Sequence, residues 1–151
     1  MSHATRNSFT SRYPGPYAVH PGTDGVDNTF DIICSSTGDR IIAATYWEAE
    51  EEALLIACVV TLALEMARRA KRPTHFSHAT KAKLNQFMSR HPGPYSHKQF
   101  VDDMRAEIGV AVKEGSSLLL SFVTHPDDPQ AIADAHYMAT ALNRLFWPAV
   151  V

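Results

Sequence analysis

The chain has 151 residues, of which 45% are hydrophobic and 20% charged, and its formal net charge is −2. This composition is ordinary for a soluble globular protein, and a chain of this length can bury a core without disulfides or metal. The composition also argues against long nucleic acid as a partner, because that function calls for a strongly basic domain. The two cysteines, Cys34 and Cys58, lie in apolar runs, which predicts small buried thiols and a reducing compartment.

The first third of the chain predicts an arm and a small antiparallel meander. Residues 1–13 are polar and non-periodic, so we expect a flexible N-terminal arm ahead of a single domain over residues 14–151. The segments 17–20, 29–34 and 40–46 are rich in Thr, Ile and aromatic residues and predict strands.

A long helix is predicted after the meander. Thr45 and Glu48 match a capping box at its start, and Pro73 ends the pattern. Residues 53–64 are apolar on almost every side of a helix, which predicts that this helix is the buried centre of the fold.

The second half predicts two further helices, one interior strand and a last helix. Residues 79–90 form the first helix, and a capping box at Ser96 and Gln99 opens a second one that Gly115 ends. Residues 116–124 are almost continuously apolar, as in an interior strand, and Asp128 caps the last helix. The predicted order is β-β-β-α-α-α-β-α, an α+β fold.

One short motif occurs twice. Residues 11–17 read SRYPGPY and residues 89–95 read SRHPGPY. The Pro-Gly-Pro core suits a tight turn. Since residues 18–39 predict a hairpin and residues 97–113 a helix, we favour one rigid corner used twice over an internal duplication.

Residues 16–57 combine two strands, a polar turn and an acidic, Ala-rich helix start. The segment resembles a group of short phage-encoded proteins of unknown activity. The matching letters are Pro16-Tyr17, Phe30-Asp31-Ile32-Ile33, Thr37-Gly38-Asp39-Arg40-Ile41-Ile42-Ala43, Glu48-Ala49-Glu50-Glu51-Glu52-Ala53 and Leu55-Ile56-Ala57. The resemblance implies a phage or prophage accessory protein, a class in which many members counter host defence.

The charges are distributed unevenly. Residues 66–101 hold eight Lys and Arg residues and no acidic residue. Lys and Arg bind phosphate, and aromatic rings stack on bases, so this tract predicts contact with a phosphate-bearing ligand such as a nucleotide signal, or with an acidic protein surface. The predicted ligand-binding residues lie within the tract 68–98 and are Arg68, Arg69, Arg72, His75, Phe76, Lys81, Arg90 and Tyr95.

The favoured function is therefore a non-enzymatic binding protein of the phage accessory type. Each of His75 and His78 opens a local His-x-Ser/Thr pattern that resembles the motif of two-histidine phosphoesterases. The resemblance implies one alternative, a phosphodiesterase acting on nucleotides in which His75 and His78 serve as general acid and base. A second alternative is a structural protein that forms homo-oligomers through the apolar helix 53–64.

The remaining expectations concern cofactors and location. No cofactor and no metal is expected, because His75 and His78 lack a nearby Cys or carboxylate to complete a zinc site. Residues 1–11 lack an apolar core, and the run 53–64 is too short to cross a bilayer. We therefore expect a cytoplasmic protein without a membrane partner.

Overall fold

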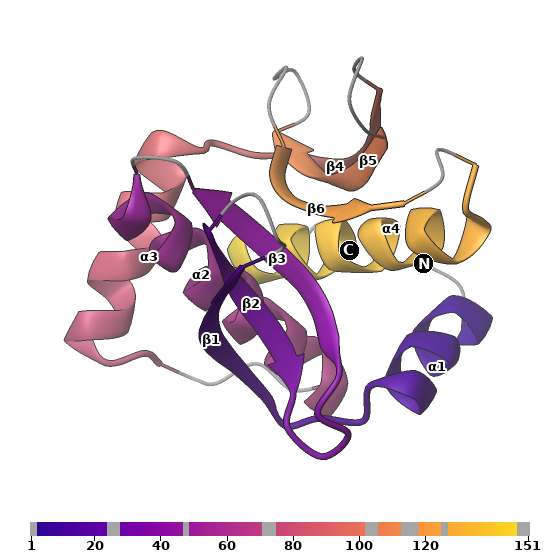
Figure 1. Cartoon of the computed structure of the whole chain (residues 1–151). Coiled ribbons are helices and arrows are strands. Elements are labelled where there is room, and N and C mark those ends of the chain that lie inside the picture. Colours follow the sequence, from indigo (N-terminus) through magenta and orange to yellow (C-terminus); the bar gives the residue numbers. More distant parts are fainter. Residues whose placement is uncertain are drawn as a thin grey trace.

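The computed structural model describes residues 3–23, 28–46, 49–70, 75–101, 106–112, 118–124 and 127–147. Within these residues the protein has the predicted α+β fold, with a six-stranded antiparallel sheet in the order β1-β2-β3-β6-β5-β4 (Figure 1). The elements in chain order are α1 (His3–Arg12), β1 (Tyr17–Thr23), β2 (Asn28–Cys34), β3 (Arg40–Tyr46), α2 (Glu50–Arg69), α3 (His78–Arg90), β4 (Tyr95–Val101), β5 (Ala106–Val112), β6 (Leu118–Val123) and α4 (Pro129–Phe146).

The chain contains an internal structural repeat of the form α-β-β-β-α, so the preference for a corner used twice is wrong. Every pairing between β1 and β2 recurs 78 positions later between β4 and β5: Tyr17 pairs with Cys34, and Tyr95 with Val112. The register shift after Ile32 in β2 recurs after Val110 in β5. The two SRxPGPY motifs are therefore equivalent positions of two similar halves.

The two halves are joined edge to edge in the middle of the sheet. Strands β3 and β6 are antiparallel, and Ala43 pairs with Ser121, its own counterpart 78 positions later. A pseudo-two-fold axis therefore passes through this pair. Figure 1 shows the halves as a purple group (β1–β3) and an orange group (β4–β6) that meet along β3 and β6.

The helices connect the two halves. The last helix of each half packs on its own strands, α2 on β1–β3 and α4 on β4 and β5. The first helix of each half packs instead on the last helix of the other, α1 on α4 and α3 on α2. One apolar cluster contains residues of both halves, so the chain folds around a shared core.

The segment expected as a flexible arm contains α1 and is part of this core. Phe9 is only 1% exposed, and its ring stacks on that of Tyr137 in α4 at 4.3 Å between ring centres. Its counterpart Phe87 in α3 is also fully buried. Phe9 is the buried apolar side chain among those described in α1, and the segment lacks the apolar periodicity that would predict a packed helix.

The helix predicted from Ser96 to Gly115 is also wrong. Residues from Ser96 onward form β4, and β5 pairs on both sides, with β4 and β6. The apolar spacing suits a helix, but pairing with two strands overrides it. A Cβ at Gly109 would lie 1.9 Å from the carbonyl oxygen of Leu120, so glycine permits this close approach. Residues 113–117, including Gly115, lie outside the described residues.

Several other predicted strands and caps are confirmed. β2, β3 and β6 lie where they are predicted, and Asp128 caps α4 by accepting hydrogen bonds from the N–H groups of Gln130 and Ala131. Thr45 is not a cap, because it belongs to β3 and α2 begins at Glu50 without a side-chain cap. Helix α2 is packed against the sheet, although Leu54 on its outer side is 41% exposed.

Candidate functional site

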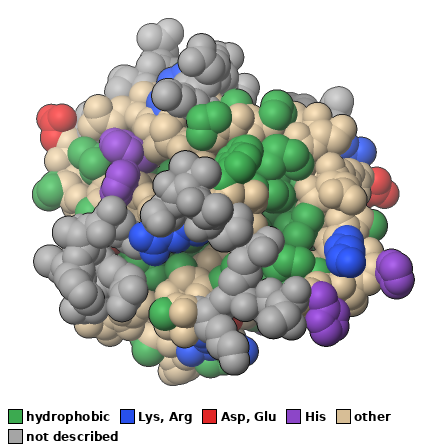
Figure 2. All heavy atoms as spheres, turned by 180° about the vertical axis from the view of Figure 1, so that it is seen from behind, with side chains coloured by type: hydrophobic (Ala, Val, Ile, Leu, Met, Phe, Trp, Pro, Cys, Tyr) green, Lys and Arg blue, Asp and Glu red, His purple; other side chains and the backbone are tan. Residues whose placement is uncertain are grey.

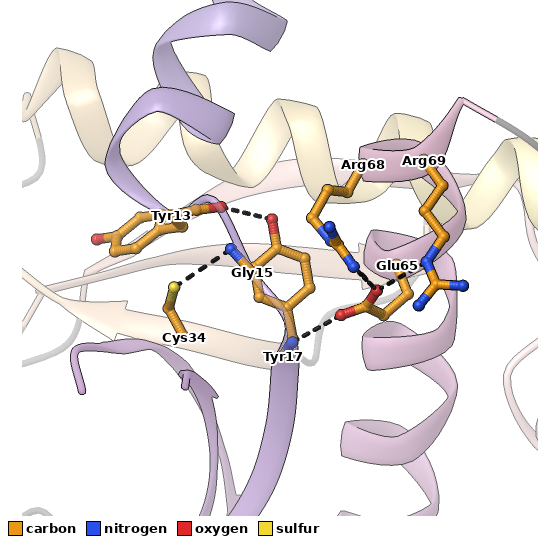
Figure 3. A network of polar contacts seen from close by, with 7 residues as sticks. All are labelled: Tyr13, Gly15, Tyr17, Cys34, Glu65, Arg68 and Arg69. Carbon is orange, nitrogen blue, oxygen red and sulfur yellow. Dashed lines mark hydrogen bonds and ion pairs between the residues drawn. The ribbon is translucent and has the colours of Figure 1, made fainter. Parts of the chain in front are cut away.

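The SRxPGPY corners hold the first strand of each half against its last helix. In both corners the peptide bond between Gly and the second Pro is cis. The Tyr17 hydroxyl donates to the carbonyl of Tyr13 at 2.7 Å, and the Tyr95 hydroxyl makes the equivalent 2.7 Å bond to His91. The N–H of Tyr17 donates to the Glu65 carboxylate at 2.6 Å (Figure 3), so the corner has a structural role.

The predicted phosphate-binding residues Arg68 and Arg69 lie in the last turn of α2, where both contact Glu65 (Figure 3). Arg68 is mostly buried and lies 2.7 Å from the Glu65 carboxylate, whereas Arg69 is 67% exposed at 3.5 Å. Glu65, just outside the acid-free tract, therefore compensates part of the positive charge of these two arginines.

The structure separates Arg90 and Tyr95 from these arginines. Arg90 contacts Glu52 in the first turn of α2, and Glu52 and Arg68 are separated by about 24 Å of helix, at roughly 1.5 Å per residue. Tyr95 is 3% exposed and packs among aromatic residues, so its ring is not on the surface where a base could stack. These two residues do not belong to a common site with Arg68.

The other predicted residues lie around the start of α3. His75, His78 and Lys81 are exposed, and Phe76 is half-buried against the core. Ser77 caps α3 through its hydroxyl, which accepts from the N–H of Thr80. Arg72 lies outside the described residues. Arg69 at the end of α2 and Lys81 in the first turn of α3 are exposed cations of the tract, and these two residues are called the α2–α3 corner.

A cavity of about 300 Å³ lies at the junction of the two halves. It is bounded by β3, β6, the first turns of α4 and the end of α1, next to the pair of Ala43 and Ser121. Its lining residues are mostly polar and include Arg12, Tyr13, Arg40, Thr45, Ser121, Thr124, Asp128, Gln130 and Asp134. This site has no local signal in the sequence, because its residues come from four elements and two of them lie in the expected arm.

An ion pair between Arg12 and Asp134 forms one wall of the cavity. The guanidinium donates from both terminal nitrogens to the carboxylate, at 3.1 and 2.5 Å, and the Gln130 amide donates to the same carboxylate at 3.3 Å. Burial would lower the pKa of Arg12, but its hydrogen bonds and charge attraction to Asp134 outweigh this and raise it. Arg12 Nε is buried without a hydrogen-bond partner among the described residues.

The charges of the cavity acids are already compensated. Asp128 accepts from two backbone N–H groups of α4 and from the Thr124 hydroxyl at 2.9 Å, so the helix N-terminus balances its charge. Arg40, by contrast, is 48% exposed and lies 3.8 Å from Asp31. Arg40 is therefore the cation of the cavity with the weakest tie to an acid.

Comparison of the two halves shows which polar residues of the cavity the repeated fold does not require. At the positions equivalent to Asp134, Arg40 and Thr45, the other half has Ile56, Leu118 and Val123. Ile56 is buried just as Asp134 is. A buried carboxylate is costly, and the other half shows that the fold accepts an apolar side chain at this position. These polar residues therefore line the cavity on one side of the pseudo-two-fold axis only, and the repeated fold does not require them.

The equivalent corner of the other half has a different charge arrangement. There Arg90 and His91, the counterparts of Arg12 and Tyr13, both contact Glu52. Burial raises the pKa of Glu52, but hydrogen bonds and charge attraction from His91 and Arg90 lower it below its ordinary value overall. Each half therefore binds the last helix of the other through an arginine at the end of its first helix.

No protein-family model matches the sequence, and comparison with curated proteins and with solved structures gave no significant match. In the part of the chain that the structure describes, no helix is both long enough and apolar enough to span a membrane.

Proposed function

We propose that this protein is a non-enzymatic binding protein whose junction cavity holds a small phosphate-bearing ligand of the mononucleotide class. The observation that carries the proposal is the cavity itself, which Arg12, Arg40 and Tyr13 all line. Its volume of about 300 Å³ is at the lower end of the range for small-molecule sites, roughly 300–1,000 Å³, which favours a mononucleotide over a larger ligand.

The chemistry of the lining supports an anionic ligand. Arginine matches the geometry of phosphate oxygens, and Arg40 is only loosely engaged by Asp31. The buried Nε of Arg12 lacks an acceptor among the described residues, and a ligand oxygen would supply one. The half-buried Tyr13 ring lies under the Arg12 guanidinium, 5.0 Å from the ring centre, so an aromatic and a cationic contact for a ligand lie together.

The proposal moves the ligand away from the basic tract. The exposed Arg69 and Lys81 at the α2–α3 corner remain the second location at which phosphate, or an acidic protein surface, would bind. The resemblance of residues 16–57 to phage-encoded proteins supports a role as a phage accessory protein, for which sequestering a nucleotide signal is one route to counter host defence.

Isothermal titration with AMP, GMP, CMP and UMP tests the proposal. Wild-type protein should bind at least one of them, and Arg40→Gln should weaken that affinity about ten-fold or more, because a hydrogen bond to a charged group contributes about 1.5–3 kcal/mol. Arg69→Gln is the matched control: it removes the same charge from an exposed position outside the cavity.

The control also locates the ligand. If Arg69→Gln weakens binding while Arg40→Gln does not, the ligand lies at the α2–α3 corner and the cavity assignment is wrong. If wild-type protein binds none of the four nucleotides, the proposed ligand class is wrong.

A further inference from the structure

Two histidines from different elements face each other outside the cavity. His97 lies in β4 and His136 in α4, which packs on β4. Both side chains are exposed, and their ring centres are 5.5 Å apart at an interplanar angle of 85°. Figure 2 shows histidine side chains at the surface on the face opposite to that of Figure 1. We propose that His97 and His136 together bind a divalent transition-metal ion such as Zn²⁺.

The distance between the rings fits a shared metal ion. A zinc–nitrogen bond is about 2.0–2.1 Å long, and the ring centre lies roughly 1.1 Å beyond the nitrogen, so each ring centre is about 3.2 Å from the metal. Two such ligands at a tetrahedral angle place their ring centres about 5.2 Å apart. The observed 5.5 Å is close to this value, so the two rings lie at the separation that a shared ion requires.

The fold does not require histidine at either position. The equivalent positions of the first half, 78 residues earlier, are Val19 in β1 and Cys58 in α2. Val19 packs against the core. The same backbone arrangement is thus built with small apolar side chains in one half and with two imidazoles in the other, which indicates that the imidazoles serve a purpose other than packing.

The donor set defines the kind of site. Imidazole suits Zn²⁺, Cu²⁺ and Ni²⁺, whereas Mg²⁺ and Ca²⁺ prefer oxygen ligands. Among the described residues, no group of three or more His, Cys, Asp and Glu side chains is placed to hold a metal ion. The protein therefore supplies two ligands, and water or the oxygen of a bound molecule completes the coordination, which makes the site weaker than a four-ligand structural zinc site.

Isothermal titration of the full chain with ZnCl₂ in a non-coordinating buffer tests this proposal. We expect one Zn²⁺ per chain, and His97→Val or His136→Ala should each weaken binding at least ten-fold, since a chelate of two ligands becomes a single imidazole. The double variant His75→Ala/His78→Ala is the matched control, because it removes another exposed histidine pair, and it should retain wild-type affinity.

The repeat allows a gain-of-site experiment. The double variant Val19→His/Cys58→His should bind two Zn²⁺ per chain, because it installs the same pair in the other half, and circular dichroism would verify that it folds. Retention of Zn²⁺ affinity in folded His97→Val, or its loss in the His75/His78 double variant alone, would overturn the proposal. Either result is independent of nucleotide binding in the cavity.

Discussion

Arg12 and Asp134 form a two-pronged ion pair that joins the first helix to the last across 122 positions of the chain. Asp134 is 4% exposed, and removing Arg12 would leave this buried carboxylate without its ion-pair partner. The pair fixes the wall of the cavity and holds α1 on the other half. The stability of the junction can therefore be tested through these two side chains.

Replacing Arg12 alone should reduce the free energy of unfolding more than replacing both residues of the ion pair. We expect Arg12→Leu to reduce the free energy of unfolding by about 2 kcal/mol, below the 3–5 kcal/mol of a fully buried pair, because the Arg12 side chain is one-third exposed. The double variant Arg12→Leu/Asp134→Ile, with the residue that the other half has at position 56, should recover most of this loss. Urea unfolding measures both, and a double variant less stable than Arg12→Leu would contradict the account.

The contacts of Glu52 predict an effect of acid on stability. Its pKa is lower in the folded protein than in the unfolded chain, so it contributes stability that is present above its ordinary pKa of about 4.5 and is lost as the pH falls below that value. Glu52→Gln should therefore lose less stability than the wild type between pH 6 and pH 3 in urea unfolding. Glu51→Gln, at an exposed position of the same turn, is the control. An unchanged pH profile for Glu52→Gln would argue against the contacts with Arg90 and His91.

Alanine substitutions at two glycines distinguish the cost of backbone strain from the cost of steric crowding. Gly38 has a φ of +78°, and no atom lies within 4 Å of the position that a Cβ would take. Gly38→Ala should therefore lower the free energy of unfolding only by the strain of a left-handed alanine, about 1–2 kcal/mol. Gly15 has a φ of +84°, and a Cβ there would lie 2.5 Å from Cδ of Arg68. Gly15→Ala should therefore destabilise the protein more than Gly38→Ala in thermal unfolding. Equal losses would show that Arg68 moves aside without cost.

The sequence predicts strands and caps well where the local signal and the final environment agree. β2 and β3 combine β-branched residues with a polar turn, and Asp128 with Pro129 marks the start of α4, so both are predicted correctly. β4 and β5 are predicted as a helix, because their apolar spacing is ambiguous and only pairing with β6 decides it. The same ambiguity hides the repeat, since the two halves look alike only when β4 and β5 are strands.

The site is harder to predict than the fold. The charge distribution along the sequence indicates the basic tract, but it contains no sign that Arg68 contacts Glu65 or that Arg90 contacts Glu52. The cavity has no local signature, because the pseudo-two-fold arrangement brings Arg12 and Asp134 together from opposite ends of the chain. Once the repeat is known, alignment of the two halves indicates the cavity, because polar residues such as Asp134 and Arg40 stand where the other half has apolar ones.

A binding role and a phosphodiesterase predict different fates for a nucleotide. After incubation with cyclic diadenosine monophosphate and denaturation of the protein, chromatography should recover the nucleotide intact. A linear product that disappears in the His75→Ala/His78→Ala variant would instead support catalysis by these histidines.

The most direct test of the central claim is to map where a mononucleotide binds. ¹⁵N-labelled protein would be titrated with AMP, or with the mononucleotide that binds best, while the backbone amide resonances are followed by NMR. We predict that the largest shifts occur at the cavity, for Ile41 and Ala43 of β3, Ser121 of β6 and Gln130 of α4. Large shifts at Arg69 and Lys81, with the cavity amides unchanged, would contradict this prediction.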